Sequence, residues 1–222
     1  MSKKNNQKPT CHLCNSFHYC TIGKPNENIN NCPMVHKKEI EKEALHIYTS
    51  NENVKKSTKE ASIVEAEGYI DWPRLKDTIE YARRMEFTKI GIAFCVGLLS
   101  EAKKIAQILQ RAQFKVYSVC CKTGSLKKTD LGIPKEYTMK SRTGFTIGWI
   151  SCNPVAQALL LNDCKTDLNL IVGLCVGHDI TFTQLSKAPV STLIAKDRSS
   201  PHNPALILYF IMEIMLHHQQ TF

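Results

Sequence analysis

Short apolar runs alternate with helix-forming segments over the last two thirds of the chain. The apolar runs have the length of strands and cover residues 89–94 (KIGIAF), 115–121 (KVYSVCC), 168–175 (LNLIVGLC) and 190–195 (VSTLIA). Runs that are apolar at nearly every position, rather than at every second one, are typical of strands buried on both faces. A parallel sheet that is covered by helices on both sides buries its strands in this way.

Helix signals fall between these runs. We expect one helix from Ser100, as its cap, to Gln113, and a second that starts at Asn153-Pro154, because these residues are preferred at helix starts. A short third helix is expected to begin at Asp179, again as its cap. The alternation predicts a Rossmann-like three-layer α/β domain with a mostly parallel sheet over residues 89–222.

The chain before the sheet divides into two further segments. Residues 34–88 carry helix formers in three stretches, whereas residues 1–33 are polar and rich in cysteine. We therefore expect a cysteine-rich metal-binding segment (1–33), a helical segment that packs on the core (34–88) and the α/β domain (89–222).

The last predicted helix begins at Asn203-Pro204 and is apolar on nearly all sides through Leu216. Such a helix is either buried within the protein or covered by a second copy in a homodimer. It is too short to span a membrane, and no other apolar run reaches the roughly 18 residues that a span requires.

The cysteines of the α/β domain stand where the strands end. Cys95, Cys121 and Cys175 end or follow apolar runs, and Cys152 directly precedes the helix start at Asn153-Pro154. In a parallel sheet, the carboxyl ends of the strands and the amino ends of the following helices share one edge, where ligands bind in a crevice. The sequence therefore predicts that these four thiols converge at that edge.

Two other cysteines are treated differently. Cys120 and Cys121 are adjacent, so their side chains point to opposite faces of an extended strand, and Cys121 is favoured for the crevice because it is nearer the end. Cys164 falls at the far end of its helix, so we expect it at the opposite edge of the sheet, outside the site.

Polar residues follow the same edge. His178 and Asp179 come after the third strand, Asp197 follows the fourth, and His202-Asn203 precede the last helix. We expect them to join the thiols in binding a cofactor or a small molecule. Each has an ordinary alternative, since Asp179 can serve only as a helix cap and His178 can be a common loop histidine. Asp197 and Arg198 form either a structural ion pair or a polar clamp on a ligand.

Four further cysteines lie close together near the amino terminus. They form a C-x2-C-x5-C-x11-C run at Cys11, Cys14, Cys20 and Cys32. Four thiolates hold zinc or an iron–sulfur cluster in proteins. The irregular spacing and the final Cys32-Pro33 favour an iron–sulfur cluster. Zinc is the alternative, and the histidines that could replace a thiolate are His12, His18 and His36.

The composition narrows the setting and the partners. The chain carries ten cysteines and its first residues lack the apolar stretch of a signal peptide, so we expect a cytoplasmic protein with reduced thiols. There, cysteines serve metal binding or catalysis more often than disulfides. The formal net charge is +9, but the lysines occur as scattered pairs, which disfavours nucleic acid. A small anionic ligand, or an acidic or redox partner protein, accounts for the charge equally well.

Several motifs together resemble a known family. They are Cys11-His-Leu-Cys14, Phe94-Cys95-Val96-Gly97-Leu98, Cys152-Asn153-Pro154, Gly173-Leu-Cys175-Val-Gly177-His178-Asp179, and Ala195-Lys196-Asp197-Arg198 with His202-Asn203-Pro204. They are similar to those of uncharacterised cysteine-rich bacterial and archaeal proteins grouped as domain of unknown function 1847, which is described as metal-binding. The resemblance covers nearly the whole chain and implies metal binding in a prokaryotic cytosol, without implying a particular reaction.

Three functions fit these observations. The first is a metalloprotein with an amino-terminal centre and a second metal, cluster or thiol reaction site in the crevice, redox-active on a small anionic molecule. The second is an enzyme in which Cys175 or Cys152 is the nucleophile and His178 the base. The third is a non-enzymatic metal-sensing or regulatory module. No glycine-rich phosphate-binding pattern occurs, so the sequence implies no nucleotide cofactor.

Overall fold

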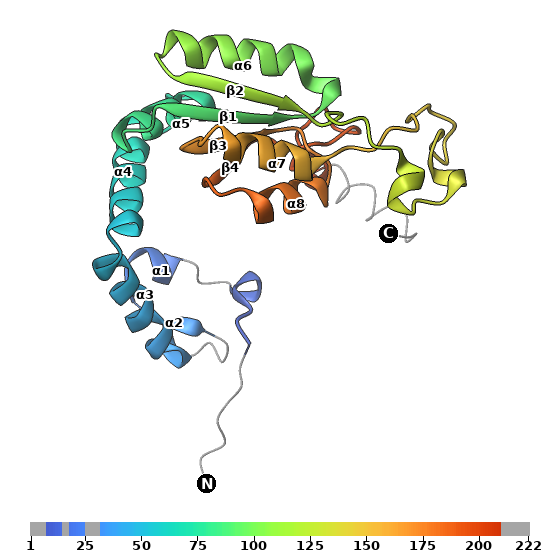
Figure 1. Ribbon diagram of the computed structural model, residues 1–222. Helices are drawn as coiled ribbons and strands as arrows, with labels where there is room; N and C mark the ends of the chain where they lie inside the picture. The colour runs from blue at the N-terminus through green and yellow to red at the C-terminus, as the bar shows by residue number, and fades with distance from the viewer. Residues whose placement is uncertain (1–7, 15–17, 25–31, 210–222) are drawn as a thin grey trace. The chain divides into compact units, whose positions relative to one another are not determined.

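The computed structural model describes residues 8–14, 18–24 and 32–209 (Figure 1). The chain divides into two compact units, Met1–Ile63 and Val64–Phe222.

The first unit is helical over the stretch for which the sequence predicts helices. Its helices are α1 (His18–Thr21), α2 (Pro33–His36), α3 (Lys38–Ser50) and the larger part of α4 (Glu52–Gly68), which continues into the second unit. Helices α3 and α4 are separate because Asn51 lies between them in an extended conformation. Its side-chain oxygen accepts hydrogen bonds from the N–H groups of Asn53 and Val54, which stabilises the start of α4.

The second unit is built on a four-stranded parallel sheet. Its strands are β1 (Lys89–Phe94), β2 (Lys115–Cys120), β3 (Leu168–Val172) and β4 (Val190–Ile194), in the order β2-β1-β3-β4. All three strand pairings are parallel, which confirms the predicted α/β fold. Every residue of β3 and all but the first of β1 are buried, and this burial explains why both runs are almost wholly apolar.

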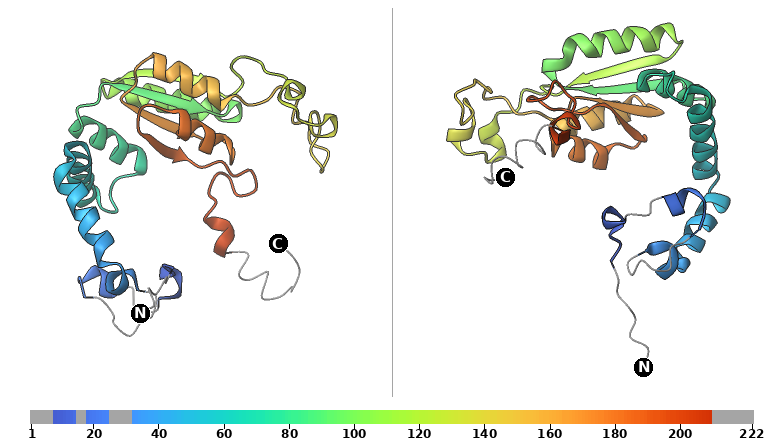
Figure 2. Two further views of the ribbon diagram at one scale, coloured as in Figure 1. Left: turned by 60° about the horizontal axis from the view of Figure 1, so that its bottom comes forward. Right: turned by 180° about the vertical axis from the view of Figure 1, so that it is seen from behind.

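Helices cover both faces of the sheet. They are α5 (Arg74–Arg84), α6 (Leu99–Arg111), α7 (Pro154–Asp163) and α8 (His178–Leu185). Figures 1 and 2 show α6 on one face and α7 with α8 on the opposite face. Helix α6 contributes Ala102, Ile105 and Leu109 to the core, and α7 contributes Ala158 and Leu161. The sheet is therefore the middle one of three layers.

Close packing at the centre of the sheet requires a glycine in β1. Asn169 of the neighbouring β3 is fully buried, and its side chain forms hydrogen bonds with Thr166 Oγ1 and Ser186 Oγ, each at 2.8 Å. A Cβ atom on Gly91 would lie 2.0 Å from Asn169 Oδ1. Gly91 thus leaves room for a buried amide that joins β3 to the segments before it and after α8.

A second buried amide joins α7 to the carboxyl ends of two strands. Gln157 Nε2 donates to the carbonyl of Phe94 at 3.2 Å and to that of Val119 at 2.7 Å. Phe94 is the last residue of β1, and Val119 is the last but one of β2. Helix α7 is therefore fixed against the edge at which the strands end.

Helix α7 starts as the sequence predicts, but two other helix starts differ. Asn153 Oδ1 accepts a hydrogen bond from Ala156 N at 2.9 Å, so Asn153 is the cap of α7. Helix α6 instead begins at Leu99, after a short 3-10 turn, and Ser100 is not its cap. Helix α8 begins at His178 with Gly177 at its N-cap position, so the prediction that Asp179 caps this helix was wrong.

The third strand is shorter than its apolar run. It ends at Val172, because Gly173 adopts a left-handed backbone conformation with φ of 70° that turns the chain out of the sheet. Cys175 therefore lies in the loop after β3 rather than at the last position of the strand.

The predicted last helix lies largely outside the described residues. Pro204 lies in a turn and Asn203 in irregular backbone before it, helical backbone begins only at residue 206, and residues 210–222 are outside the described part of the chain. Leu208 and Tyr209 are exposed. Among the described residues, no helix has both the length and the apolar character needed to cross a bilayer.

Replacing Gly91 with alanine is expected to destabilise the second unit. The new methyl group overlaps Asn169 Oδ1, so the free energy of unfolding should fall by about 1–3 kcal/mol, as in other overpacked cores. Chemical denaturation measures this change. Gly97→Ala is the matched control, because the nearest atom to its new Cβ is Lys196 Nζ at 3.6 Å, which is an ordinary contact. Equal losses in the two variants would contradict a packing role for Gly91.

Candidate functional site

The topology of the sheet places a switch point between β1 and β3. From β1 the chain crosses outward to β2, and it then returns past β1 to β3 and continues to β4. The carboxyl ends of β1 and β3 therefore flank the position at which ligands bind in open α/β sheets. Cys95 follows β1 directly, and Cys175 follows β3 after the turn at Gly173.

Four thiols and one imidazole come together at this edge. They form a thiol cluster that consists of Cys95, Cys121, Cys152, Cys175 and His178. Cys121 interacts with Cys95 and Cys152, and His178 interacts with Cys152 and Cys175. The structure thus brings together side chains that are up to 83 positions apart along the chain, counted from 95 to 178.

Cys121 lies at the centre of the thiol cluster. Its side chain is 1% exposed, and its Sγ lies 3.7 Å from the Sγ of Cys152. The backbone fixes this pair, because Asn153 N donates to Cys121 O at 2.7 Å and Cys121 N donates to Phe94 O at 2.8 Å. Cys121, rather than Cys120, is therefore the residue of the adjacent pair that contacts the other thiols.

Cys152 lies half-buried directly before α7. The Cys121 thiol stabilises its thiolate by hydrogen bonding, and His178 and Lys122 add positive charge beside it. Together these groups lower the pKa of Cys152 to about 4. Cys152 is therefore a thiolate at neutral pH.

His178, the first residue of α8, interacts with two thiols. Hydrogen bonding and negative charge from Cys152 and Cys175 raise the pKa of His178 to about 10, so it is an imidazolium at neutral pH. Its Nδ1 atom is buried and has no hydrogen-bond partner among the residues that the structure describes. Such atoms are rare in folded proteins and call for an explanation, of which a functional role is one.

The pKa values of Cys95 and Cys121 are shifted in opposite directions. The thiol of Cys121, the N–H of Gly97 and the charge of Lys196 stabilise a thiolate at Cys95 and lower the pKa of Cys95 to about 5. The pKa of Cys121 is raised, because its sulfur lies between those of Cys152 and Cys95 and is buried. The cluster therefore holds one protonated thiol between two thiolates.

Arg198 binds the fourth thiol, and the candidate site derived from the sequence did not include it. Its Nη2 atom lies 2.9 Å from Cys175 Sγ. His178 and, after it, Arg198 lower the pKa of Cys175. The sequence left Arg198 open between an ion pair with Asp197 and a clamp on a ligand, and in the structure it bonds to a thiol. The sequence signal that pointed to Arg198 was its position: it lies two residues after Lys196, in the loop that follows β4.

Three predicted site residues bond within their own loop. The carboxylate of Asp197 accepts hydrogen bonds from Ser199 and Ser200, which lower the pKa of Asp197. His202 Nδ1 accepts a hydrogen bond from Asp197 N at 3.2 Å, and Asn203 N donates to Ser200 O at 2.6 Å. In the described part of the chain, these bonds close the loop after β4 and do not reach the thiol cluster.

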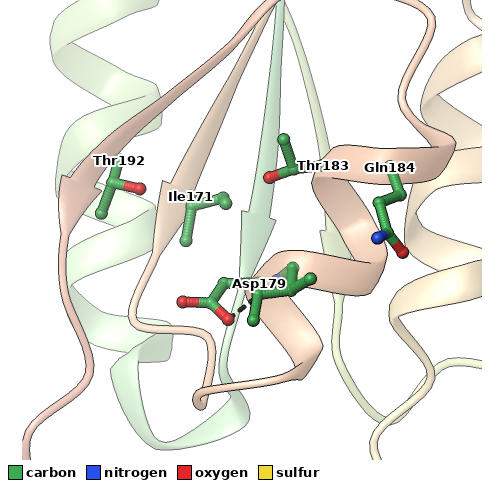
Figure 3. Close-up of a pocket in the computed structure, with 6 residues that line it drawn as sticks. Ile171, Asp179, Thr183, Gln184 and Thr192 are labelled. Carbon is green, nitrogen blue, oxygen red and sulfur yellow. Dashed lines mark hydrogen bonds between the residues drawn. The ribbon is translucent and has the colours of Figure 1, made fainter. Parts of the chain in front are cut away.

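Asp179 lines a shallow pocket between α8 and the strands β3 and β4, as Figure 3 shows. Its Oδ1 atom accepts a hydrogen bond from Ile180 N at 2.8 Å. The other lining residues are apolar or uncharged, namely Ile171, Ile180, Thr183, Gln184 and Thr192. Of the residues that the structure describes, no cysteine lines this pocket, so Asp179 and its neighbour His178 face different surroundings although they are adjacent in α8.

Cys164 lies at the end of α7, where the strands begin. Its N–H donates to Leu160 O at 3.1 Å. Close to it in the sequence, the carboxylate of Asp167 accepts hydrogen bonds from the N–H groups of Thr88 and Lys89, each at 2.8 Å, at the start of β1. Cys164 is thus far from the edge that carries the thiol cluster, as expected.

The amino-terminal cysteines belong to the first unit. Cys11 opens a 3-10 turn in which Cys14 N donates to Cys11 O at 3.0 Å, Cys20 lies in α1, and Cys32 precedes α2. Four thiols are a donor set that suits zinc or an iron–sulfur cluster. Within residues 8–14, 18–24 and 32–209, however, no three histidine, cysteine, aspartate or glutamate side chains are arranged to hold a metal ion.

Fold and site together define a thiol-rich parallel α/β protein. The family model "Protein of unknown function (DUF1847)" matches residues 32–193, and the chain belongs to this family. The match confirms the resemblance that the motifs indicate.

A relative comes from the archaeon Methanocaldococcus jannaschii. It is described as Uncharacterized protein MJ0455 and is 44% identical over 173 residues, which cover 78% of this chain and 85% of the archaeal protein. No solved structure matches the chain. The segment that matches the family model holds the whole thiol cluster but, of the four amino-terminal cysteines, only Cys32.

We expect alkylation of Cys152 by iodoacetamide to depend on pH with an inflection near 4, because the thiolate is the reactive form and persists above its pKa. A cysteine in a model peptide inflects near about 8.5. Peptide mapping after timed labelling between about pH 2.5 and 9 measures the rate at this residue on both sides of the expected inflection. His178→Gln removes the imidazolium, and the inflection should rise by roughly one pH unit or more. Asp179→Asn, on the same helix, is the matched control. An inflection above pH 7 in the unmodified protein would refute the assignment.

Proposed function

We propose that the chain is a thiol-dependent enzyme in which Cys152 is the nucleophile and His178 is its cationic partner. One observation carries the proposal: His178 interacts with Cys152 and Cys175 at the switch point of a parallel sheet. A thiolate that is kept ionised by an adjacent imidazolium is the activated form that cysteine nucleophiles require.

The arrangement supports a displacement reaction. The electron pair of the Cys152 thiolate forms a bond to an electrophilic atom of the substrate, and the leaving group departs with the electron pair of the bond that breaks. The proton that the leaving group then takes is available on His178. The other thiol that interacts with His178 is Cys175, and its sulfur lies 2.9 Å from Arg198 Nη2.

The charges around the thiol cluster favour a small anionic substrate. Lys122, Lys196 and Arg198 act on the thiols of the cluster, in addition to His178. Four cations thus surround at most three thiolates, because Cys121 retains its proton. A surplus of positive charge at a half-buried site attracts an anion and lowers the energy of its bound state.

The quantity to measure is the rate of labelling by iodoacetate, which is negatively charged, divided by the rate of labelling by neutral iodoacetamide. We expect this ratio to be about tenfold higher at Cys152 than at a free cysteine. Arg198→Gln should reduce this ratio severalfold. The matched control is Lys165→Gln, which changes an exposed lysine outside the cluster. Timed labelling with peptide mapping measures both ratios. A ratio equal to that of free cysteine would refute the anionic substrate. An unreactive Cys152, or one equivalent of iron or zinc that Cys152→Ser removes, would overturn the nucleophile assignment.

A metal site in the amino-terminal segment is a second candidate function. The observation that favours it is the turn between Cys11 and Cys14, which gives two thiols the close spacing of a metal knuckle. Metal binding commonly orders such small segments, since the bond energy of the metal serves as folding energy. Cys20 and Cys32 would complete the set.

This second candidate predicts bound metal that depends on the first unit alone. Elemental analysis after anaerobic reconstitution with zinc, or with iron and sulfide, should find at least one equivalent of metal per chain. Cys14→Ser should lower that content at least tenfold, whereas Cys164→Ser should leave it unchanged. Equal metal content in both variants would exclude the amino-terminal thiols as ligands.

A further inference from the structure

Two thiols of the cluster differ sharply in access although they lie side by side. Cys152 is half-buried and directly precedes α7, whereas Cys121 is 1% exposed. Their sulfur atoms are 3.7 Å apart, and a disulfide bond of about 2.05 Å requires them to approach by roughly 1.7 Å more. Cys152 is therefore the more exposed of the two, and it lies close enough to Cys121 to react with it after a small movement.

We propose that Cys152 and Cys121 form a dithiol–disulfide couple, in which Cys152 attacks a small anionic disulfide and Cys121 resolves the mixed disulfide. The proposal rests on the function given above, because it takes Cys152 as the nucleophile. It adds a second reacting residue, a substrate class and a redox change at the site.

The steps balance in atoms and electrons. The Cys152 thiolate attacks one sulfur of the substrate disulfide, the substrate S–S bond breaks, and one substrate thiolate leaves. Cys121 then gives up its proton, and its sulfur attacks Cys152 Sγ and expels the second substrate half, which leaves as a thiol with that proton. Two electrons have passed from the protein to the substrate, and a Cys121–Cys152 disulfide remains. A dithiol reductant returns the protein to its starting state.

The local structure suits these roles. Asn153 N donates to Cys121 O at 2.7 Å, so the backbone segments that carry the two cysteines are already hydrogen-bonded to each other. Val96 N donates to Cys121 Sγ at 3.3 Å and can stabilise the developing thiolate when Cys121 loses its proton. The helix that starts after Cys152 likewise favours negative charge on its sulfur when the disulfide is reduced.

Neighbouring thiols set the competing outcomes. Cys95 also interacts with Cys121, and Cys175 shares His178 with Cys152. Cys120 is adjacent to Cys121 in the sequence but does not belong to the thiol cluster, which makes it the matched control for Cys121. Lys122 and Lys115 bound the short tryptic peptide that carries both Cys120 and Cys121, so variants, rather than mapping alone, must separate these two.

The test treats the reduced full-length protein with oxidised glutathione, a small anionic disulfide, and follows the products by intact mass and peptide mapping. The wild type should lose two hydrogen atoms, release two glutathione molecules and yield a peptide that joins the Cys152 segment to the Cys120–Cys121 segment. Cys121→Ser and Cys121→Ala should stop at a glutathionyl group on Cys152, and release of the second glutathione should slow about tenfold or more. Cys120→Ser should behave as the wild type does.

The outcomes separate this inference from the function on which it rests. If the wild type also stops at glutathionylated Cys152, or if the new disulfide joins Cys152 to Cys175, the couple is refuted while the Cys152 nucleophile stands. A disulfide that joins Cys95 to Cys121 refutes the couple and also the assignment of Cys152 as the attacking thiol. If Cys152 is modified neither by glutathione nor by iodoacetamide, both proposals fail. In Cys120→Ser, a crosslink between these two segments can involve only Cys121 of the adjacent pair, so misfolding of a Cys121 variant leaves the test decisive.

Discussion

The parallel register of β1 with its two neighbours is the constraint on which the site depends. Phe94, the last residue of β1, is paired with Cys120 on one side and with Val172 on the other. The three strands therefore end at one level, and the residues that follow them emerge beside one another. Gln157 holds this level from α7 by donating to carbonyls near the ends of β1 and β2. A shift of register by one residue would move Cys121 and its sulfur to the other face of the sheet.

Electrostatics then determines which thiols of the cluster are protonated and which are ionised. Placed together in a half-buried site, several thiolates repel one another, and the cluster is stable only if protons or cations compensate them. The protein supplies both. Cys121 keeps a proton between two sulfurs, and His178, Lys122, Lys196 and Arg198 add positive charge.

The sequence was sufficient for the sheet and for the edge at which the thiols meet, because continuous apolar runs and the Asn153-Pro154 start are local signals. It was insufficient to place the start of α8. The N-cap position is occupied by Gly177, whose positive φ ends the preceding turn, and not by Asp179. The sequence also missed Arg198, because which of the two charged neighbours turns toward a thiol depends on loop geometry. Asp197 is drawn away by two serine hydroxyl groups, and this leaves Arg198 to bond with Cys175.

Cysteine count alone could not distinguish nucleophile, metal ligand and core residue, since the same side chain serves all three. Access and proton location separate them here. Cys164 lies apart at the opposite edge, Cys121 is buried and protonated, and Cys152 is half-buried and ionised. A more exposed, ionised thiol beside a buried, protonated thiol forms an ordered pair, because a solute meets the first before the second. That order follows from burial and charge, and it is the order in which the proposed couple would react.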